Sequence, residues 1–200
     1  MSQRRLVVSG FEPFDGHVRN PSGEAALHLD GSVVEGVLID SVLLPVSWVW
    51  SFRRLADVVA AVEPHALLML GVSNRDEVSF ERFAYNEANG QLDMDGIAGT
   101  ASPLIEGGPP VLEGTLPLHA LDSSPIASRV STDPGRYLCN DVYYRAMSAF
   151  SGVPLRGFVH LPPLRSVVSP RGFDEDVLRA AVTTLVGRLA AHFATITPQA

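Results

Sequence analysis

The chain has 200 residues, a formal net charge of −7 and 46% hydrophobic residues, with a mean hydropathy of +0.17. This length fits one domain with a sizeable core, and the apolar content is too high for a disordered protein. The negative charge removes the electrostatic footprint expected of proteins that bind nucleic acids or anionic membranes. All 15 cationic residues are arginines, so the chain cannot use a Schiff-base lysine or a P-loop lysine.

The N-terminal apolar stretch, Leu6 to Val8, is too short for the core of a signal peptide. Elsewhere no apolar run reaches the roughly 20 residues that a membrane span needs. We therefore expect a cytoplasmic protein without membrane attachment. The single cysteine, Cys139, excludes an intramolecular disulfide, and a free thiol stays reduced in the cytoplasm.

The first part of the chain alternates strand-like and helix-like segments. Asn20-Pro21 indicates a helix start, because Asn caps a helix and Pro suits its first position. Apolar residues at helical spacing predict a second helix over 48–63, which Pro64 ends. Strands are predicted at Leu6–Gly10, at Val33–Val46 and, as a continuous apolar run typical of burial on both faces, at Ala66–Val72.

The second part begins with an extended segment, Ser79–Asn86, followed by a long loop. Residues 87–110 hold five Gly and three Pro with little periodicity. Such a loop is either a lid over a site or a disordered excursion, and both interpretations stay open. After it the patterns predict a strand at Ile126–Ser131, a helix at Cys139–Phe150, a strand at Leu155–Leu161 and a helix at Asp174–Phe193.

This alternation predicts an α/β fold, a three-layer α/β/α sandwich with a mostly parallel twisted sheet. Residues 1–200 then form a single domain with 87–110 as its candidate lid. In such folds sites form at the carboxyl ends of strands, so the residues to examine directly follow four apolar positions. These positions are Val8, Leu70, Val130 and Val159.

Cys139 opens a predicted helix after a loop that contains Pro134-Gly135. The positive end of a helix dipole favours the thiolate form of a cysteine, which is how a nucleophile is built. The alternative is a small buried hydrophobic residue, the commonest role of a lone Cys.

His160 and Glu81 are candidate partners for this thiol. His160 lies at the end of a predicted strand, where a neutral imidazole could exchange a proton with a thiol, although it could equally be a hydrogen-bonded structural histidine. Glu81 lies between apolar neighbours and could orient the imidazole as the third member of a triad. Its alternative is a solvent-facing acid paired with Arg82 or Arg75.

Metal and nucleotide sites find little support. The six histidines show no paired-ligand spacing. Gly10 to Gly16 has glycines after a strand but not the spacing of a dinucleotide fingerprint. We therefore expect neither a metal nor a cofactor.

Four segments together resemble the pyroglutamyl-peptidase I (pyrrolidone carboxyl peptidase) family of cysteine peptidases. They match the family in order and spacing over almost the whole chain. The segments are Val8–Phe14 through Asn20-Pro21, Ser79–Asn86, Gly135–Asn140 and Gly157–Pro162.

The resemblance implies hydrolysis of the amide bond after an N-terminal pyroglutamyl residue of peptides, without a cofactor. It makes Cys139 the nucleophile, His160 the acid and base, and Glu81 the orienting carboxylate. It further implies a substrate pocket with contributions from Phe11, Phe14, Asn20, Arg75, Gln91 and Leu92.

Two of these pocket positions depart from the family pattern. Gln91 stands where the family has Arg, and Leu92 stands where it has Ile. The segment that follows, Asp93 to Gly96, is also one residue shorter than usual. These departures fall near the expected oxyanion position and the pocket wall, so they bear on rate and specificity more than on fold.

Two further interpretations remain. One is a lactam- or peptide-binding homologue of the same fold with little turnover, and the other is a nucleoside-handling α/β enzyme, for which the sequence offers no anion site. The expected partners are peptides with N-terminal pyroglutamate, with no nucleic acid and no membrane, in a homodimer or homotetramer.

Overall fold

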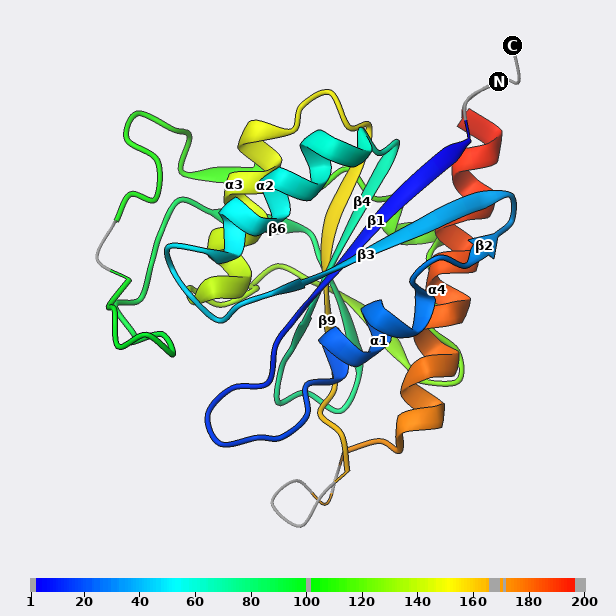
Figure 1. Ribbon diagram of the computed structural model, residues 1–200, viewed down its shortest axis with the longest axis horizontal. Helices are drawn as coiled ribbons and strands as arrows, with labels where there is room; N and C mark the ends of the chain where they lie inside the picture. Colours follow the sequence, from blue (N-terminus) through cyan, green and yellow to red (C-terminus); the bar gives the residue numbers. More distant parts are fainter. Residues whose placement is uncertain (1–2, 100–101, 166–169, 171, 197–200) are drawn as a thin grey trace.

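The computed structural model describes residues 3–99, 102–165, 170 and 172–196. A central twisted sheet lies between two pairs of helices, and the loops gather around its lower and left edges (Figure 1). In chain order the elements are β1 (Arg4–Phe11), α1 (Pro21–Leu29), β2 (Val33–Val34), β3 (Val37–Leu44), α2 (Ser51–Val62), β4 (Ala66–Val72), β5 (Val78–Glu81), β6 (Phe83–Tyr85), β7 (Val111–Glu113), the short 3₁₀ helix η1 (Leu118–Ala120), β8 (Ser128–Ser131), α3 (Leu138–Ala149), β9 (Leu155–Leu161) and α4 (Glu175–Ile196).

The main sheet has seven strands in the order β2-β3-β1-β4-β9-β5-β8. Strand β1 pairs in parallel with β3 and β4, and β4 pairs in parallel with β9. Strands β5 and β8 are parallel to each other, but β5 runs antiparallel to β9. The sheet is therefore mostly parallel, as predicted, with one reversed pair at one side and the antiparallel β2 at the other.

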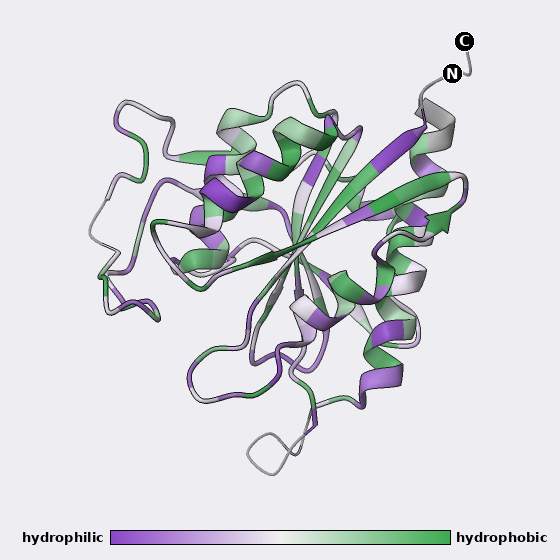
Figure 2. Ribbon diagram, viewed as in Figure 1, coloured by the Kyte–Doolittle hydropathy of each residue, from purple (hydrophilic) through white to green (hydrophobic). Residues whose placement is uncertain are grey.

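Two apolar cores hold the three layers together. Helices α1 and α4 cover one face, where Leu6, Val8 and Leu185 are buried. Helices α2 and α3 cover the other, where Val7, Leu55 and Val142 are buried. Alternate residues of β1 thus enter opposite cores, because successive strand residues point to opposite faces. Apolar residues dominate the central strands, and polar residues concentrate on the outer surfaces of the helices and in the loops (Figure 2). The predicted α/β/α sandwich is confirmed.

Two sequence predictions of single extended segments were wrong in detail. Val33–Val46 is a hairpin, because Glu35 and Gly36 take positive φ values of 49° and 76° and reverse the chain between β2 and β3. Ser79–Asn86 is split at Arg82. Its first half, β5, joins the main sheet, whereas its second half, β6, pairs with β7 in a separate two-stranded sheet.

The described part of the loop 87–110 is anchored to the domain at several points, and its residues 100 and 101 lie outside the described residues. The amide of Met94 donates to the carbonyl of Val46 at 3.1 Å, and the amide of Asn89 donates to the carbonyl of Arg136 at 2.9 Å. Closure of this loop as a lid stays a prediction. None of the helices within the described ranges has the length and apolar content that a membrane crossing requires.

Candidate active site

The site begins where three strands of the sheet lie in register. Gly71 of β4 is opposite His160 of β9, and Ser79 of β5 pairs with His160 from the other side. Cys139 reaches this row from helix α3. A Cβ atom built on Gly71 would lie 2.9 Å from Cys139 Sγ, so only a glycine leaves room for the thiol. Register and helix placement together bring Cys139 over the sheet beside His160.

Cys139 is the second residue of α3, and its side chain is partly buried. The first intrahelical bond runs from the amide of Asp141 to the carbonyl of Tyr137 at 3.1 Å. The amides before Asp141 precede the hydrogen-bond ladder, because the first N–H groups of a helix have no intrahelical acceptor. Tyr137, the N-cap residue, makes no side-chain capping bond. The helix therefore presents free N–H donors and the positive end of its dipole at the thiol.

Glu81 and His160 form a buried pair. The distance from His160 Nδ1 to Glu81 Oε1 is 2.8 Å, and both side chains are at most 5% exposed. Because Glu81 accepts at Nδ1, the opposite ring nitrogen, Nε2, is the one left for a proton exchange with Cys139. The Glu81 carbonyl is fixed as well, since the hydroxyl of Tyr143 donates to it at 2.9 Å.

The charges of the three groups depend on one another. Burial lowers the pKa of His160, but the interactions of the imidazole with Cys139 and with the Glu81 carboxylate outweigh burial and raise that pKa to about 9. Burial raises the pKa of Glu81, but its contacts with His160, Ser131 and Arg75 reverse this effect and hold the pKa below its ordinary value. At neutral pH the imidazole is therefore protonated, between the Glu81 carboxylate and the side chain of Cys139.

Arg75 braces the carboxylate. Its Nη1 donates to Glu81 Oε1 at 2.9 Å and to Ser131 Oγ at 3.3 Å, and its Nη2 donates to the carbonyl of Asp133 at 2.9 Å. Arg75 was a predicted substrate-pocket residue. The structure places it on the Glu81 carboxylate and on the loop that leads to Cys139.

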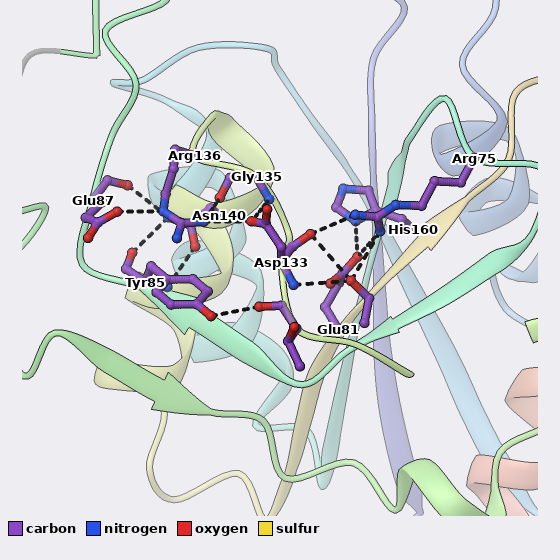
Figure 3. A network of polar contacts seen from close by, with 11 residues as sticks. Arg75, Glu81, Tyr85, Glu87, Asp133, Gly135, Arg136, Asn140 and His160 are labelled. Carbon is purple, nitrogen blue, oxygen red and sulfur yellow. Dashed lines mark hydrogen bonds and ion pairs between the residues drawn. The ribbon is translucent and has the colours of Figure 1, made fainter. Parts of the chain in front are cut away.

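The loop that leads to Cys139 carries another arginine, Arg136, which lies on the opposite side of Asp133 from Arg75 (Figure 3). Its Nη1 donates to Asp133 Oδ1 at 2.8 Å, its Nε donates to Glu87 Oε2 at 2.7 Å, and its guanidinium lies 3.8 Å from the centre of the Tyr85 ring. Asp133 thus connects Arg75, which is bound to Glu81, with Arg136, which is bound to Glu87 at the start of the long loop. The connection fixes the path of the chain into Cys139.

Asn140, next to Cys139, was not given a role by the sequence analysis. Its side chain is completely buried. It accepts from the amide of Tyr85 at 2.8 Å and donates to the carbonyls of Tyr85 and Glu87 at 2.8 and 2.9 Å. Asn140 therefore ties the start of α3 to the chain that follows Glu81. Its only sequence signal was its place beside the cysteine.

Phe11, Phe14 and Asn20 lie on β1 and the loop after it. Phe11 is buried, and its amide donates to Ser22 Oγ at 3.1 Å. Asn20 Oδ1 accepts from the amide and the hydroxyl of Ser22 at 3.0 and 2.8 Å, and its Nδ2 donates to the carbonyl of Glu12 at 3.0 Å. All groups of Asn20 are thus occupied in capping α1 and holding this loop.

Phe14 is half-buried against the core that includes Cys139 and Phe11. It also lies at the edge of an open cleft of about 1010 Å³, with Asn20 and Val72 among the lining residues. Val72 directly follows Gly71.

Gln91 and Leu92 lie on the rim of the site, on the long loop. The exposed Gln91 side chain accepts from Asn89, and its carbonyl accepts from Trp48 Nε1 at 3.0 Å. Leu92 is 65% exposed, and its carbonyl accepts from the Tyr137 hydroxyl at 3.0 Å. In this conformation the Gln91 amide is turned to its own loop, and its action on the substrate stays a prediction.

Comparisons with known proteins point to one family. A family model of pyroglutamyl peptidases matches residues 4–191. The pyrrolidone-carboxylate peptidase of Halalkalibacterium halodurans is 31% identical over 197 residues, which cover 92% of this chain and 98% of the relative. That of Coprothermobacter proteolyticus is 33% identical over 168 residues, which cover 79% of this chain and 81% of the relative.

Solved structures show the same architecture. Pyroglutamyl peptidase I from Bacillus amyloliquefaciens superposes with a TM-score of 0.87 at 25% identity and covers 95% of this chain and 98% of its own. Pyrrolidone carboxyl peptidase from Thermococcus litoralis superposes with a TM-score of 0.89 at 24% identity, covers 98% of both chains, and bears on the fold alone. Since the family model spans nearly the whole sequence, the chain belongs to the pyroglutamyl peptidase family.

Proposed function

We propose that this chain is a cysteine peptidase that hydrolyses the amide bond after an N-terminal pyroglutamyl residue of peptides. The observation that carries the proposal is the line of polar contacts from Arg75 through the buried Glu81 and His160 to Cys139. A buried acid and imidazole without a function would be costly, because desolvation penalises both charged groups. Here the attraction between the protonated imidazole and the Glu81 carboxylate offsets this desolvation cost. The imidazole also lies beside the only thiol of the chain.

The first step is attack of the Cys139 thiolate on the pyroglutamyl carbonyl carbon. The new C–S bond pushes the carbonyl electrons onto oxygen, and the free amides at the start of α3 stabilise the resulting oxyanion. His160 already carries a proton at neutral pH. It donates this proton to the leaving amine as the C–N bond breaks, so that the peptide leaves as a neutral amine and the acyl group stays as a thioester.

The second step regenerates the enzyme. His160, now neutral, takes a proton from water while the water oxygen attacks the thioester. The C–S bond breaks, pyroglutamate leaves, and the thiolate is paired with imidazolium again. Glu81 does not take the proton. It stabilises the imidazolium and keeps Nδ1 in place, with Arg75 holding the carboxylate.

The pyroglutamyl ring is flat and uncharged, which suits an apolar pocket with a few polar groups. We assign Phe11, Phe14 and Leu92 to its walls. Phe11 lies in the apolar core that also contains Leu138 of α3, Phe14 packs against that core, and the carbonyl of Leu92 accepts from Tyr137. Asn20 acts by holding the loop that carries Phe14. Gln91 is assigned to the rim. Arg75 is assigned to the triad.

The alternative of a binding homologue without turnover finds no specific support. A lactam-binding protein needs the pocket but not a protonated imidazole between a thiol and a carboxylate. We also propose that residues 1–200 act as one domain in the cytoplasm, as a homodimer or homotetramer, without nucleic acid or membrane. The net negative charge of the sequence and its mean hydropathy support the absence of nucleic-acid and membrane partners.

The test is release of a fluorogenic amine from its pyroglutamyl conjugate, with the prolyl and glutaminyl conjugates as controls. The proposal expects rapid release from the pyroglutamyl conjugate alone, because the prolyl ring lacks the lactam carbonyl and the glutaminyl group carries a charged amine. Equal release from all three conjugates, or release from none, would overturn it.

A further inference from the structure

Two loops meet over the start of α3. The amide of Asp15, on the loop after β1, donates to Met94 Sδ at 3.5 Å. The hydroxyl of Tyr137, two residues before the thiol, donates to the carbonyl of Leu92 at 3.0 Å. Asp15, Leu92 and Met94 therefore form a rim beside the nucleophile, which we call the acidic-apolar rim.

The apolar side chains of this rim are exposed although their backbone is fixed. Leu92 and Met94 are 65% and 58% exposed. Between them, the buried carboxylate of Asp93 accepts from the amides of Trp48, Asp95 and Ile97 at 2.8 to 2.9 Å. Single exposed apolar residues are common on protein surfaces. Two of them on a braced loop at the mouth of a site form a ready contact surface for a ligand.

The rim also carries an unpaired negative charge. Burial raises the pKa of Tyr137, and the charges of Asp93, Cys139 and Asp15 raise it further, so Asp15 and the thiolate act on the same phenol. Among the described residues no ion pair involves Asp15. Arg19, on the same loop, forms ion pairs with Glu24 and Glu175.

We propose that the acidic-apolar rim binds the residue that follows pyroglutamate and selects a long basic side chain, arginine or lysine. This inference rests on the proposed function. The methylene groups of such a side chain pack on Leu92 and Met94, and its cationic end reaches Asp15. A carboxylate side chain is disfavoured there because it would meet the charge of Asp15.

The test compares kcat/KM for pyroglutamyl-arginyl, pyroglutamyl-citrullyl and pyroglutamyl-glutamyl amides. Citrulline has the shape of arginine without its charge. We expect the arginyl substrate to be roughly three- to fivefold better than the citrullyl one, as befits an exposed ion pair, and the glutamyl substrate to be the poorest. Added salt should reduce the difference.

Variants separate the two parts of the rim. Asp15→Asn should abolish the difference between arginine and citrulline, and Asn tolerates the positive φ of 55° at this position. Met94→Gln should lower both rates together. Asp57→Asn, an exposed acid on α2, is the control and should change none of the ratios.

Equal rates for the arginyl and citrullyl substrates in the unmodified protein would overturn the rim proposal. Persistence of their difference in Asp15→Asn would overturn it as well. The pyroglutamyl conjugate of a neutral fluorogenic amine reports the proposed function separately, because it has no second residue for the rim to bind.

Discussion

Helices α1 and α3 both begin beside the candidate site, but their first turns are completed in different ways. Asn20 caps α1 with its side-chain oxygen and is 4% exposed. The N-cap residue of α3, Tyr137, makes no side-chain capping bond. The start of α1 is thus capped, and its role is structural. The start of α3 keeps its N–H groups and the positive end of its dipole free, and the thiol of Cys139 lies next to them.

This difference shows that a helix start without a capping side chain can support a reactive group. A capping side chain satisfies the first amides and adds about 1 kcal/mol to stability. An uncapped start forgoes that gain, but its amides remain available to a thiolate or an oxyanion. Substitutions at α3 should therefore change chemistry more than stability, and substitutions at the cap of α1 should do the reverse.

The largest effect is expected at Cys139. Cys139→Ala should reduce kcat for the pyroglutamyl conjugate by several orders of magnitude, since the nucleophile is gone. Cys139→Ser should fold equally well and be nearly as inactive, because a hydroxyl is far less nucleophilic than a thiolate. Thermal unfolding measured beside the kinetics serves as the control. An alanine variant with full activity would contradict the assignment.

The next effects concern His160 and Glu81. His160→Ala should lower the single-turnover acylation rate by roughly 10³- to 10⁴-fold, because no other group moves the proton. Glu81→Gln should cost less, since the imidazole that moves the proton is still present although its imidazolium form loses a stabilising charge. Rapid-quench kinetics measure both rates. A slower Glu81→Gln than His160→Ala would reverse the two roles.

The pH dependence sharpens the comparison further. The pKa of His160 is raised from 6.5 to about 9. Acylation should therefore fall as pH rises through about 9, where the proton donor is lost. The stability that the imidazolium contributes is likewise present below pH 6.5 and lost as pH rises through 9. In Glu81→Gln the carboxylate that raises the pKa of His160 is missing, so the alkaline limb of the pH–rate profile should move to lower pH. An unchanged limb would mean that His160 does not supply it.

The smallest catalytic effect is expected at the capped helix. Asn20→Ala should lower the unfolding free energy by about 1 kcal/mol, which is roughly 2 to 4 °C in Tm for a chain of this size. Any loss of kcat should stay far below that of the triad variants. Asn20→Asp keeps the oxygen that caps α1 but loses the donor to the Glu12 carbonyl, so it separates the cap from the loop contact. A loss of kcat as large as that of Glu81→Gln would place Asn20 in the chemistry.

Most of the fold could be predicted because the apolar patterns are strong. Ala66–Val72 and Leu155–Leu161 form strands with the expected bounds. The hairpin at Glu35 and Gly36 was missed because its turn lies inside one apolar run. The reversal of β5 and β8 could not be predicted either, since strand direction depends on pairing with distant residues.

The site residues that carry reactive groups could be predicted from the sequence. Residues that matter because of the space they leave could not. Cys139, His160 and Glu81 carry reactive groups, and the rule of strand ends led to His160 and to the residue after Leu70. That residue, Gly71, matters because the thiol occupies the place of a side chain. No sequence pattern reports such a contact. The position of Gln91 against Asn89 depends in the same way on the local fold of its loop.

The central claim is that Cys139 forms a covalent thioester with the pyroglutamyl group. Acid quenching during the first turnovers, followed by intact-protein and peptide mass spectrometry, tests it directly. We predict a mass increase of one pyroglutamyl group, located on the peptide that contains Cys139 and absent from Cys139→Ser at the same time points. An initial burst of released amine without any adduct, or with an adduct on another residue, would contradict the account.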